Sequence, residues 1–425
     1  MTGGSDVRCR PSDVGFSGAA ILPLISMDAD RPAAPVFDFD RVIDRRETGS
    51  LKWGRYAGTD ILPLWVADMD FAAPPVVLEA IRQRLDHGVL GYSAAHPGLN
   101  DILLAYLSRQ HGVEARSGDI VWLPGLVPAK SMACRCVGQP GDAVLTLTPV
   151  YPPFLIVHHD AQKRLITVPL RHDEATNGAW EIDFDALEAA VTPDTRVFLF
   201  CNPHNPVGRV YSRADVEKIA DFCLRHDLLF VSDEIHCDLV LDPETTPHFS
   251  AARLEGPIRD RLIVLMAASK TYNIPGLALA WAIVPNADLR RNFRAGGGKL
   301  IPELNPLSYH ATGAALAHGE PWRRQLLAYL RDNREFLAGF LAARLPEIRM
   351  ALPMEATYLA WLDCRALGHE NPHAFFEKAG VGLSNGVDFA APGWLRLNFG
   401  CPRSTLAEAL NRMERAVREA FPLPR

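Results

Sequence analysis

Side chains with catalytic potential follow several apolar runs that have the length and composition of buried strands. Lys270, Asp233 and Asn205 each lie within four residues of the end of such a run. Another run ends at Leu123 and leads through Gly125 into a pattern typical of a helix. Because the carboxyl ends of parallel strands meet at one edge of a sheet, we expect these groups to lie together.

A lysine amine, a carboxylate, an amide and a helix N-terminus together suit pyridoxal 5′-phosphate (PLP). The amine forms a Schiff base with the aldehyde, and a buried carboxylate keeps the ring nitrogen protonated. The amide donates to the 3′-oxygen, and the helix N-terminus binds the phosphate. Each feature alone is common, since Asn202-Pro203-His204-Asn205-Pro206 on its own is typical of a turn. Their combination at strand ends favours a PLP site.

Lysine is scarce in this chain, which limits the candidates for a Schiff base. The lysines are Lys52, Lys130, Lys163, Lys218, Lys270, Lys299 and Lys378. Lys270 is the one that follows a strand beside a carboxylate, an amide and a phosphate cradle in the predicted sheet. We therefore expect the other six to lie outside the site.

Composition excludes several classes of protein. The formal net charge of −6 is not that of a typical nucleic-acid-binding protein. Apolar residues make up 48% of the chain but form no run long enough to span a membrane. The eight cysteines are scattered without the spacing of a disulfide scaffold or a zinc site, so we expect reduced thiols, a cytoplasmic protein and no metal.

The middle of the chain alternates between strand and helix patterns, which predicts an α/β fold with a mostly parallel sheet covered on both faces. The clearest helices are 126–137 and 213–226. Gly296-Gly297-Gly298 is interpreted as a flexible connector near the substrate entrance. The predicted strands are 119–123, 143–147, 164–168, 196–201, 228–232, 262–267 and 279–284.

The pattern changes after residue 305, where a long helix (322–345), two strands (358–362 and 394–399) and a last helix (404–420) predict a smaller α+β domain. We expect a large domain over 81–304 and a small one over 305–425, with 35–80 packing against the small domain. Residues 1–34 are interpreted as a disordered extension, or as preceding a true start at Met27. A signal peptide is disfavoured because the short apolar run is broken by Pro23.

Over residues 35–422 the chain resembles the aminotransferase class I/II superfamily of PLP enzymes (fold type I), and within it the MalY/PatB subgroup of cystathionine β-lyases (C–S lyases). His236 and the segment Trp65–Phe71 are features of that subgroup. The stretches that carry the resemblance are 37–40, 65–71, 91–93, 148–154, 201–208, 233–236, 269–273 and 396–402.

The resemblance implies roles for residues around the cofactor. Lys270 would form the Schiff base and later move the α-proton, and Asp233 would pair with the pyridine nitrogen. Asn205 would donate to the 3′-oxygen and line the substrate site, with His236 nearby. Tyr151 would stack on the cofactor ring. Catalysis would therefore depend on Lys270, Tyr151 and Asp233.

The resemblance also implies residues for the substrate and the phosphate. Arg396 would hold the α-carboxylate in a bidentate fork, with Ala67 beside it. Tyr92 would reach the phosphate in the neighbouring subunit of a homodimer. The remaining phosphate contacts would come from Leu126, Val127, Ala129 and Ser269.

Two departures from the superfamily pattern concern the phosphate. Ala267 and Ala278 stand where many members carry a serine and an arginine. Pro128 has no N–H, which removes one donor from the cradle. We therefore expect the phosphate to depend more on backbone amides, Ser269 and Tyr92.

The predicted function is α,β-elimination from L-cystathionine or related cysteine S-conjugates, giving a thiol, pyruvate and ammonia. One alternative is an aminotransferase, which would use the same residues for the cofactor and the carboxylate. A further alternative is a regulator-binding protein with weak lyase activity. His236 and the segment Trp65–Phe71 favour the lyase.

Overall fold

The computed structural model describes residues 35–175 and 177–420. Residues Phe37–Arg425 form one unit, which contains all the described helices and strands. The predicted N-terminal extension over 1–34 lies outside the described residues.

A seven-stranded sheet forms the centre of this unit, in the order β2-β8-β7-β6-β5-β3-β4. Every neighbouring pair is parallel except those that β8 makes with β7 and β2. All seven predicted strands are confirmed, with ends within one residue of the prediction. Their bounds are β2 Ile120–Leu123, β3 Ala143–Thr148, β4 Arg164–Pro169, β5 Thr195–Cys201, β6 Leu229–Asp233, β7 Leu262–Met266 and β8 Ala280–Ile283.

Helices cover both faces of this sheet. Because alternate residues of a strand point to opposite faces, each strand contributes side chains to two separate cores. In β5, Val197 and Leu199 share a core with helices α4, α5 and α8, whereas Phe198 and Phe200 pack with α3 and α7. The strands β3, β6 and β7 are buried along their whole length. The helices of this region are α2 Pro75–Asp86, α3 Pro97–His111, α4 Leu126–Arg135, α5 Pro152–Asp160, α6 Phe184–Ala190, α7 Arg213–Arg225, α8 Ala287–Gly297 and α9 Pro306–His318.

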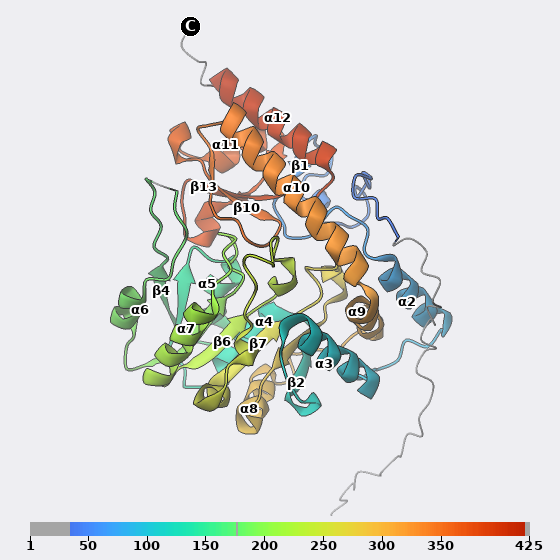
Figure 1. Ribbon diagram of the computed structural model, residues 1–425, viewed down its shortest axis with the longest axis vertical. Helices are drawn as coiled ribbons and strands as arrows, with labels where there is room; N and C mark the ends of the chain where they lie inside the picture. The colour runs from blue at the N-terminus through green and yellow to red at the C-terminus, as the bar shows by residue number, and fades with distance from the viewer. Residues whose placement is uncertain (1–34, 176, 421–425) are drawn as a thin grey trace, which may run out of the picture. The chain divides into compact units, whose positions relative to one another are not determined.

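A smaller antiparallel sheet follows, in the order β12-β13-β10-β9, as the change of pattern after residue 305 predicts. In Figure 1 its strands β10 and β13 lie beside the long helix α10. The strands are β9 Arg349–Met350, β10 Leu359–Asp363, β12 Ser384–Asn385 and β13 Trp394–Asn398, and the helices are α10 Glu320–Arg344, α11 Pro372–Lys378 and α12 Arg403–Ala420.

The segment before the central sheet is tied to this smaller region by a short parallel pair. Strand β1 (Leu62–Pro63), which follows helix α1 (Leu51–Gly54), pairs with β11 (Val381–Gly382). This pairing brings the chain that continues into Trp65–Phe71 next to β13, which carries Arg396.

The triple glycine is not a connector, so that interpretation is wrong. Gly296 and Gly297 form the end of helix α8, and Gly298 caps it with a φ of +53°. A Cβ atom on Gly296 would lie 2.6 Å from the carbonyl oxygen of Met132 in α4. The glycine therefore allows α8 to pack closely against α4, the helix that begins at the predicted phosphate cradle.

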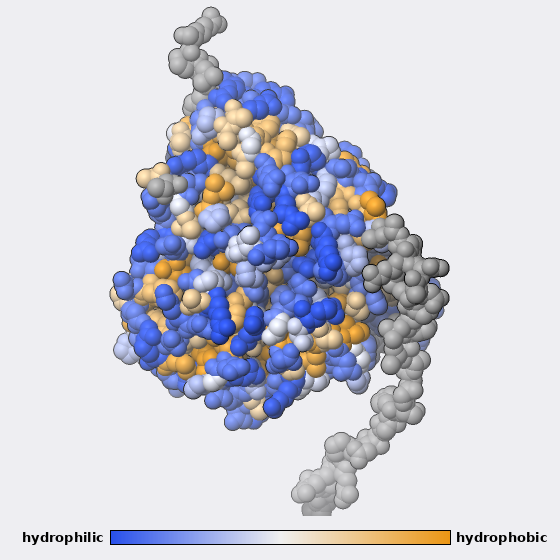
Figure 2. Space-filling view, in the orientation of Figure 1, coloured by the Kyte–Doolittle hydropathy of each residue, from blue (hydrophilic) through white to orange (hydrophobic). Residues whose placement is uncertain are grey.

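Among the described helices, none combines the length and the apolar character that a membrane crossing requires. Hydrophilic and hydrophobic residues are interspersed over the face drawn in Figure 2.

Candidate active site

Lys270 lies four residues beyond the end of β7, and its amine faces the segment Trp65–Phe71. Its Nζ donates to the carbonyl oxygen of Ala67 at 2.6 Å. Burial lowers the pKa of Lys270 to about 8, with the charges of Arg396 and Lys130 acting in the same direction against Asp68 and Asp233. At near-neutral pH, a larger fraction of this amine is uncharged and nucleophilic than in an ordinary lysine.

Asp233 is the last residue of β6 and is buried next to a lysine that the sequence did not assign to the site. Its Oδ2 accepts from Nζ of Lys130 at 2.7 Å, and its Oδ1 accepts from the backbone N–H of Ile235 at 3.2 Å. Lys130, in the second turn of α4, is 1% exposed. The expectation that every lysine except Lys270 lies outside the site is therefore wrong.

Asn205 and Arg396 meet although they come from opposite halves of the chain. Nη1 of Arg396 donates to Oδ1 of Asn205 at 3.0 Å, and Nη2 donates to the carbonyl oxygen of Trp65 and to Oγ of Ser384. Because a guanidinium can only donate, the amide oxygen of Asn205 must face Arg396. The N–H₂ group of Asn205 is then free to donate to a ligand. That group suits an oxygen ligand.

Arg396 is a buried cation without an acidic partner in the described part of the chain. Its Nε is buried and has no hydrogen-bond partner there, and burial lowers the pKa of Arg396 to about 10. The guanidinium also lies over the ring of Phe389, at 4.7 Å. A buried charge of this kind calls for an anionic ligand, and a substrate carboxylate would pair with it.

Tyr151 and His236 contribute rings to the same region. Tyr151 directly precedes α5, and its backbone N–H donates to the carbonyl oxygen of Asn205 at 3.0 Å. The Nδ1 atom of His236 is buried without a partner among the described residues. Burial and the charges of Lys270, Arg396 and Lys130 lower the pKa of His236 to about 3, so this ring is neutral near pH 7.

The predicted phosphate cradle is the start of α4, after Gly125 with a φ of +153°. No side chain caps this helix. Two of the three predicted donors, Leu126 and Val127, occupy its first two positions, where backbone N–H groups have no intrahelical partner. The third, Ala129, is fully buried, and its N–H donates to the Gly125 carbonyl oxygen at 3.4 Å.

Asn273 clamps the segment that covers Lys270, a role that sequence reasoning did not assign. Its Nδ2 donates to the carbonyl oxygens of Met69 and Phe71, at 2.9 and 2.7 Å, and its Oδ1 accepts from the Met69 N–H at 2.9 Å. On the other side, Asn398 donates to the carbonyl oxygens of Val66 and Asp68, at 2.7 Å each. These bonds hold the Ala67 carbonyl over the amine.

Tyr358 is a further residue of the site that the sequence did not single out. Its hydroxyl donates to the Ala67 carbonyl oxygen at 3.0 Å, the same atom that Lys270 binds. Burial raises the pKa of Tyr358, with Asp68 acting in the same direction, so the phenol keeps its proton. Tyr358 directly precedes a buried strand, and this position is the sequence feature that could have identified it as a site residue.

Two predicted residues stand apart from these contacts. Tyr92 lies between α2 and α3, and its side chain is 97% exposed. Ser269 is half-buried next to Lys270. The backbone carbonyl oxygen of Ser269 accepts from the N–H of Ile274 at 2.9 Å. Ala67 lies in the segment Trp65–Phe71, and Leu126, Val127 and Ala129 lie in α4. The remaining predicted residues lie at or just beyond the carboxyl ends of β3, β5 and β6, beyond β7, or on β13.

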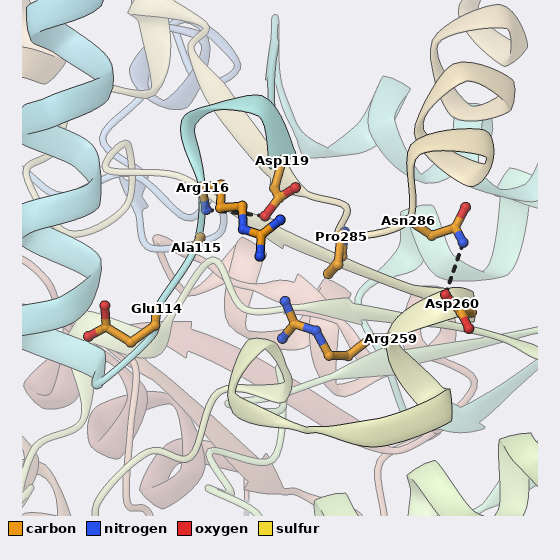
Figure 3. A pocket seen from close by; sticks show the side chains of 8 residues that line it. All are labelled: Glu114, Ala115, Arg116, Asp119, Arg259, Asp260, Pro285 and Asn286. Carbon is orange, nitrogen blue, oxygen red and sulfur yellow. Dashed lines mark hydrogen bonds between the residues drawn. The ribbon is translucent and has the colours of Figure 1, made fainter.

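A separate pocket of about 470 Å³ lies near the opposite ends of the strands (Figure 3). Asp119, which lines it, directly precedes β2, and Arg259 and Asp260 precede β7. A hydrogen bond of 3.0 Å between Asn286 and Asp260 crosses one side of this pocket. Its lining mixes acids and arginines and contains none of the residues described above.

Comparison with known proteins gives a consistent picture. The model of the family "Aminotransferase class I and II" matches residues 59–413. Cystathionine beta-lyase PatB of Bacillus subtilis is 36% identical and covers 89% of this chain and all of that protein. Protein MalY of Escherichia coli is 34% identical over 90% of this chain and 99% of its own. The aspartate aminotransferase of Pyrococcus abyssi is 26% identical, over 85% of this chain and 92% of its own.

Solved structures agree with this result. OvoB is 41% identical with a TM-score of 0.85, over 90% of this chain and 99% of that one. Cystalysin of Treponema denticola, which contains a pyridoxal 5′-phosphate cofactor, is 31% identical with a TM-score of 0.86, over 91% and 100%. The PLP-bound C–S lyase of Staphylococcus hominis is 32% identical with a TM-score of 0.83, over 90% and 99%.

Proposed function

The chain belongs to the aminotransferase class I and II family, and we propose that it is a PLP-dependent carbon–sulfur β-lyase acting on L-cystathionine or related cysteine S-conjugates. The observation that carries the proposal is that Lys270, whose pKa burial and the charge of Arg396 lower, shares the site with this buried arginine, which has no acidic partner in the described residues. The similarity to cystathionine β-lyases over nearly the whole chain supports this reaction over others.

The described residues fit PLP at each of its polar groups. The amine of Lys270 suits the aldehyde, Asp233 the ring nitrogen, and the free amide donor of Asn205 the 3′-oxygen. The open N–H groups at the start of α4 suit the phosphate. When bound, PLP supplies an electron sink for the pair of electrons left when the α-proton is removed.

Arg396 binds the substrate, and Lys270 removes its α-proton. The guanidinium binds the α-carboxylate and so fixes the position of the Cα–H bond. The neutral amine of Lys270 then takes the α-proton, for which its lowered pKa suits it near neutral pH. The carbonyl oxygen of Ala67, which accepts from both Lys270 and Tyr358, holds the amine in place.

The overall reaction consumes one water molecule. The Cβ–S bond of the cysteine S-conjugate breaks, and the sulfur leaves as a thiol. Hydrolysis of the remaining three-carbon fragment gives pyruvate and ammonia. His236 is neutral near pH 7 and adds no positive charge to the site.

The proposal includes a homodimer and a cytoplasmic location. In the dimer, Tyr92 of one subunit would reach the phosphate in the other. Tyr92 lies beside the exposed Val89 and Leu90, and this group of exposed apolar side chains supports a subunit interface there. The seven described cysteines are free thiols, which supports a reducing compartment.

The test is an assay of the purified full-length protein with PLP and L-cystathionine. We expect equal amounts of pyruvate and free thiol without any added keto acid, and no product from the Lys270→Ala variant. A keto acid formed only when an acceptor keto acid is present, with no thiol, would contradict the lyase and establish an aminotransferase. Cystine and S-alkyl cysteines in the same assay would rank the leaving groups.

A further inference from the structure

Lys130 occupies a position that the proposed reaction does not require. It lies in the second turn of α4, is 1% exposed, and puts its Nζ 2.7 Å from Oδ2 of Asp233. In the described part of the chain, Asp233 is its one salt-bridge partner. A buried ammonium is expensive without a counter-ion, so this pair holds each charge in place.

The carboxylate of Asp233 already has two donors before any cofactor is considered. Lys130 occupies Oδ2, and the N–H of Ile235 occupies Oδ1 at 3.2 Å. Each oxygen can accept a second bond, so a protonated ring nitrogen can still bind there. That nitrogen would share the carboxylate with a full positive charge instead of holding it alone.

The surroundings of the Lys130 amine place it close to the cofactor ring as well. Its Nζ lies 4.6 Å from the ring centroid of Phe154 and 5.8 Å from that of Tyr151, the residue predicted to stack on PLP. Cation–π contact with these rings stabilises the ammonium at this position. The same charge also contributes to the lowered pKa values of Lys270 and His236.

We propose that Lys130 is a positioning residue that holds Asp233 and weakens the attraction of this carboxylate for the proton on the ring nitrogen of PLP. This inference rests on the proposed function, because it presupposes PLP in the site. Lys130 therefore sets how strong an electron sink the cofactor becomes. The Coulomb repulsion between two cations that share one buried carboxylate is the physical cause.

The test compares two cofactors that differ only at the ring nitrogen. Full-length enzyme is titrated with PLP and with its 1-deaza analogue, which carries C–H in place of that nitrogen. We expect Lys130→Met to raise the preference for PLP over the analogue by about tenfold, the effect of about 1.4 kcal/mol on one charge-assisted contact. Lys130→Arg, which keeps the charge, should restore the preference of the wild type.

Lys52→Met is the matched control, because Lys52 is also buried and also forms a 2.7 Å ion pair, with Asp70. It should lower stability and leave the preference unchanged. An equal change in affinity for both cofactors in Lys130→Met would contradict the proposed role of Lys130 and leave the proposed function intact. Failure of the wild type to bind PLP would overturn the proposed function together with this role.

The pH titration of the bound cofactor's absorbance gives a second readout. Loss of the Lys130 charge should raise the midpoint of the Schiff-base transition in Lys130→Met and leave it near the wild-type value in Lys130→Arg. A purely structural role predicts the same midpoint in all three proteins, and that result would contradict the proposal.

Discussion

Burial lowers the pKa of Lys270 from 10.5 to about 8, with further influence from neighbouring charges. At pH 7.5, about a quarter of such an amine is neutral, against roughly one part in a thousand for an ordinary lysine. We therefore expect the rate of covalent PLP capture by the cofactor-free enzyme to rise with pH through a midpoint near 8 and then level off. Stopped-flow absorbance at a series of pH values measures this rate.

The capture rate rises with pH because only the uncharged amine reacts with PLP. Below the midpoint the amine is protonated and unreactive, so the rate should fall about tenfold per pH unit. A midpoint near 10.5 would show that burial does not perturb this amine. The amine of free lysine, reacted with PLP under the same conditions, is the control.

Single residues differ in how far the sequence could predict them. Lys270, Asp233 and Asn205 lie at the end of a strand or within four residues of it, so local pattern and the geometry of parallel sheets were sufficient. Lys130 lies 103 residues before Asp233 along the chain, within a helix that has no special composition. Its contact depends on how α4 packs on the sheet, which no local pattern reports.

At the scale of elements, the segment Trp65–Phe71 has no regular secondary structure and is held by side chains from elsewhere. Asn273 makes three hydrogen bonds to it from a backbone with a φ of +53°. Asn273→Gly suits that φ and removes only the bonds. We expect a loss of about 1–3 kcal/mol in stability and faster hydrogen exchange over 65–71, measured by mass spectrometry.

Asn177→Gly is the matched control, because Asn177 has a φ of +51° and donates to the Met350 carbonyl oxygen in a different region. It should leave exchange over 65–71 at the wild-type rate. Unchanged exchange in Asn273→Gly would mean that the other contacts of the segment, those of Asn398, Tyr358 and Arg396, hold it without Asn273. Lyase activity should fall with Asn273→Gly, because the Ala67 carbonyl would no longer hold the amine of Lys270.

The contact between α8 and α4 gives a second prediction at this scale. Gly296→Ala would put a Cβ 2.6 Å from the Met132 carbonyl oxygen, so the two helices must move apart. We expect a loss of about 1–3 kcal/mol in stability and weaker PLP binding, because α4 begins at the predicted phosphate cradle. Thermal unfolding with and without PLP measures both effects.

Gly339→Ala on the exposed side of α10 is the control, since a Cβ there meets nothing within 4 Å. Alanine favours a helix, so this change should be neutral or raise stability by about 0.5–1 kcal/mol. Equal unfolding temperatures for Gly296→Ala and the wild type would contradict the close contact.

Elements were predictable where their pattern is local. The strands of the central sheet are continuous apolar runs because both faces are covered, and their ends were predicted within one residue. The three glycines at 296–298 gave the opposite result. Glycine in a sequence is typical of a connector, but here the reason for glycine is a neighbouring backbone, which appears only when α8 is placed against α4.

At the scale of the whole molecule, the exposed apolar side chains between α2 and α3 are where the proposed second subunit would bind. Val89, Leu90 and Tyr92 are 62%, 56% and 97% exposed. The resemblance to the family implies a homodimer in which Tyr92 reaches the phosphate in the neighbouring subunit. A subunit interface involves residues that no internal pattern of strands and helices reports, so it could be predicted only from the resemblance.

Mixing two defective variants tests whether active sites are shared between subunits. Lys270→Ala has no amine for the cofactor, and Tyr92→Ala should bind PLP less tightly, so each homodimer should be weakly active or inactive when PLP is limiting. In a mixed dimer, one site combines Lys270 from one subunit with Tyr92 from the other and is intact. We therefore expect activity at limiting PLP to rise above the mean of the separate variants after the subunits are mixed and exchanged.

The size of the recovery follows from counting sites. Equal amounts of the two variants give half mixed dimers by random pairing, and each has one intact site of two, so about a quarter of wild-type activity should return. Tyr92→Phe, which keeps the ring and loses the hydroxyl, separates the phosphate contact from apolar packing at the interface. Activity equal to the mean of the two variants would contradict shared sites and would leave each subunit with a complete site of its own.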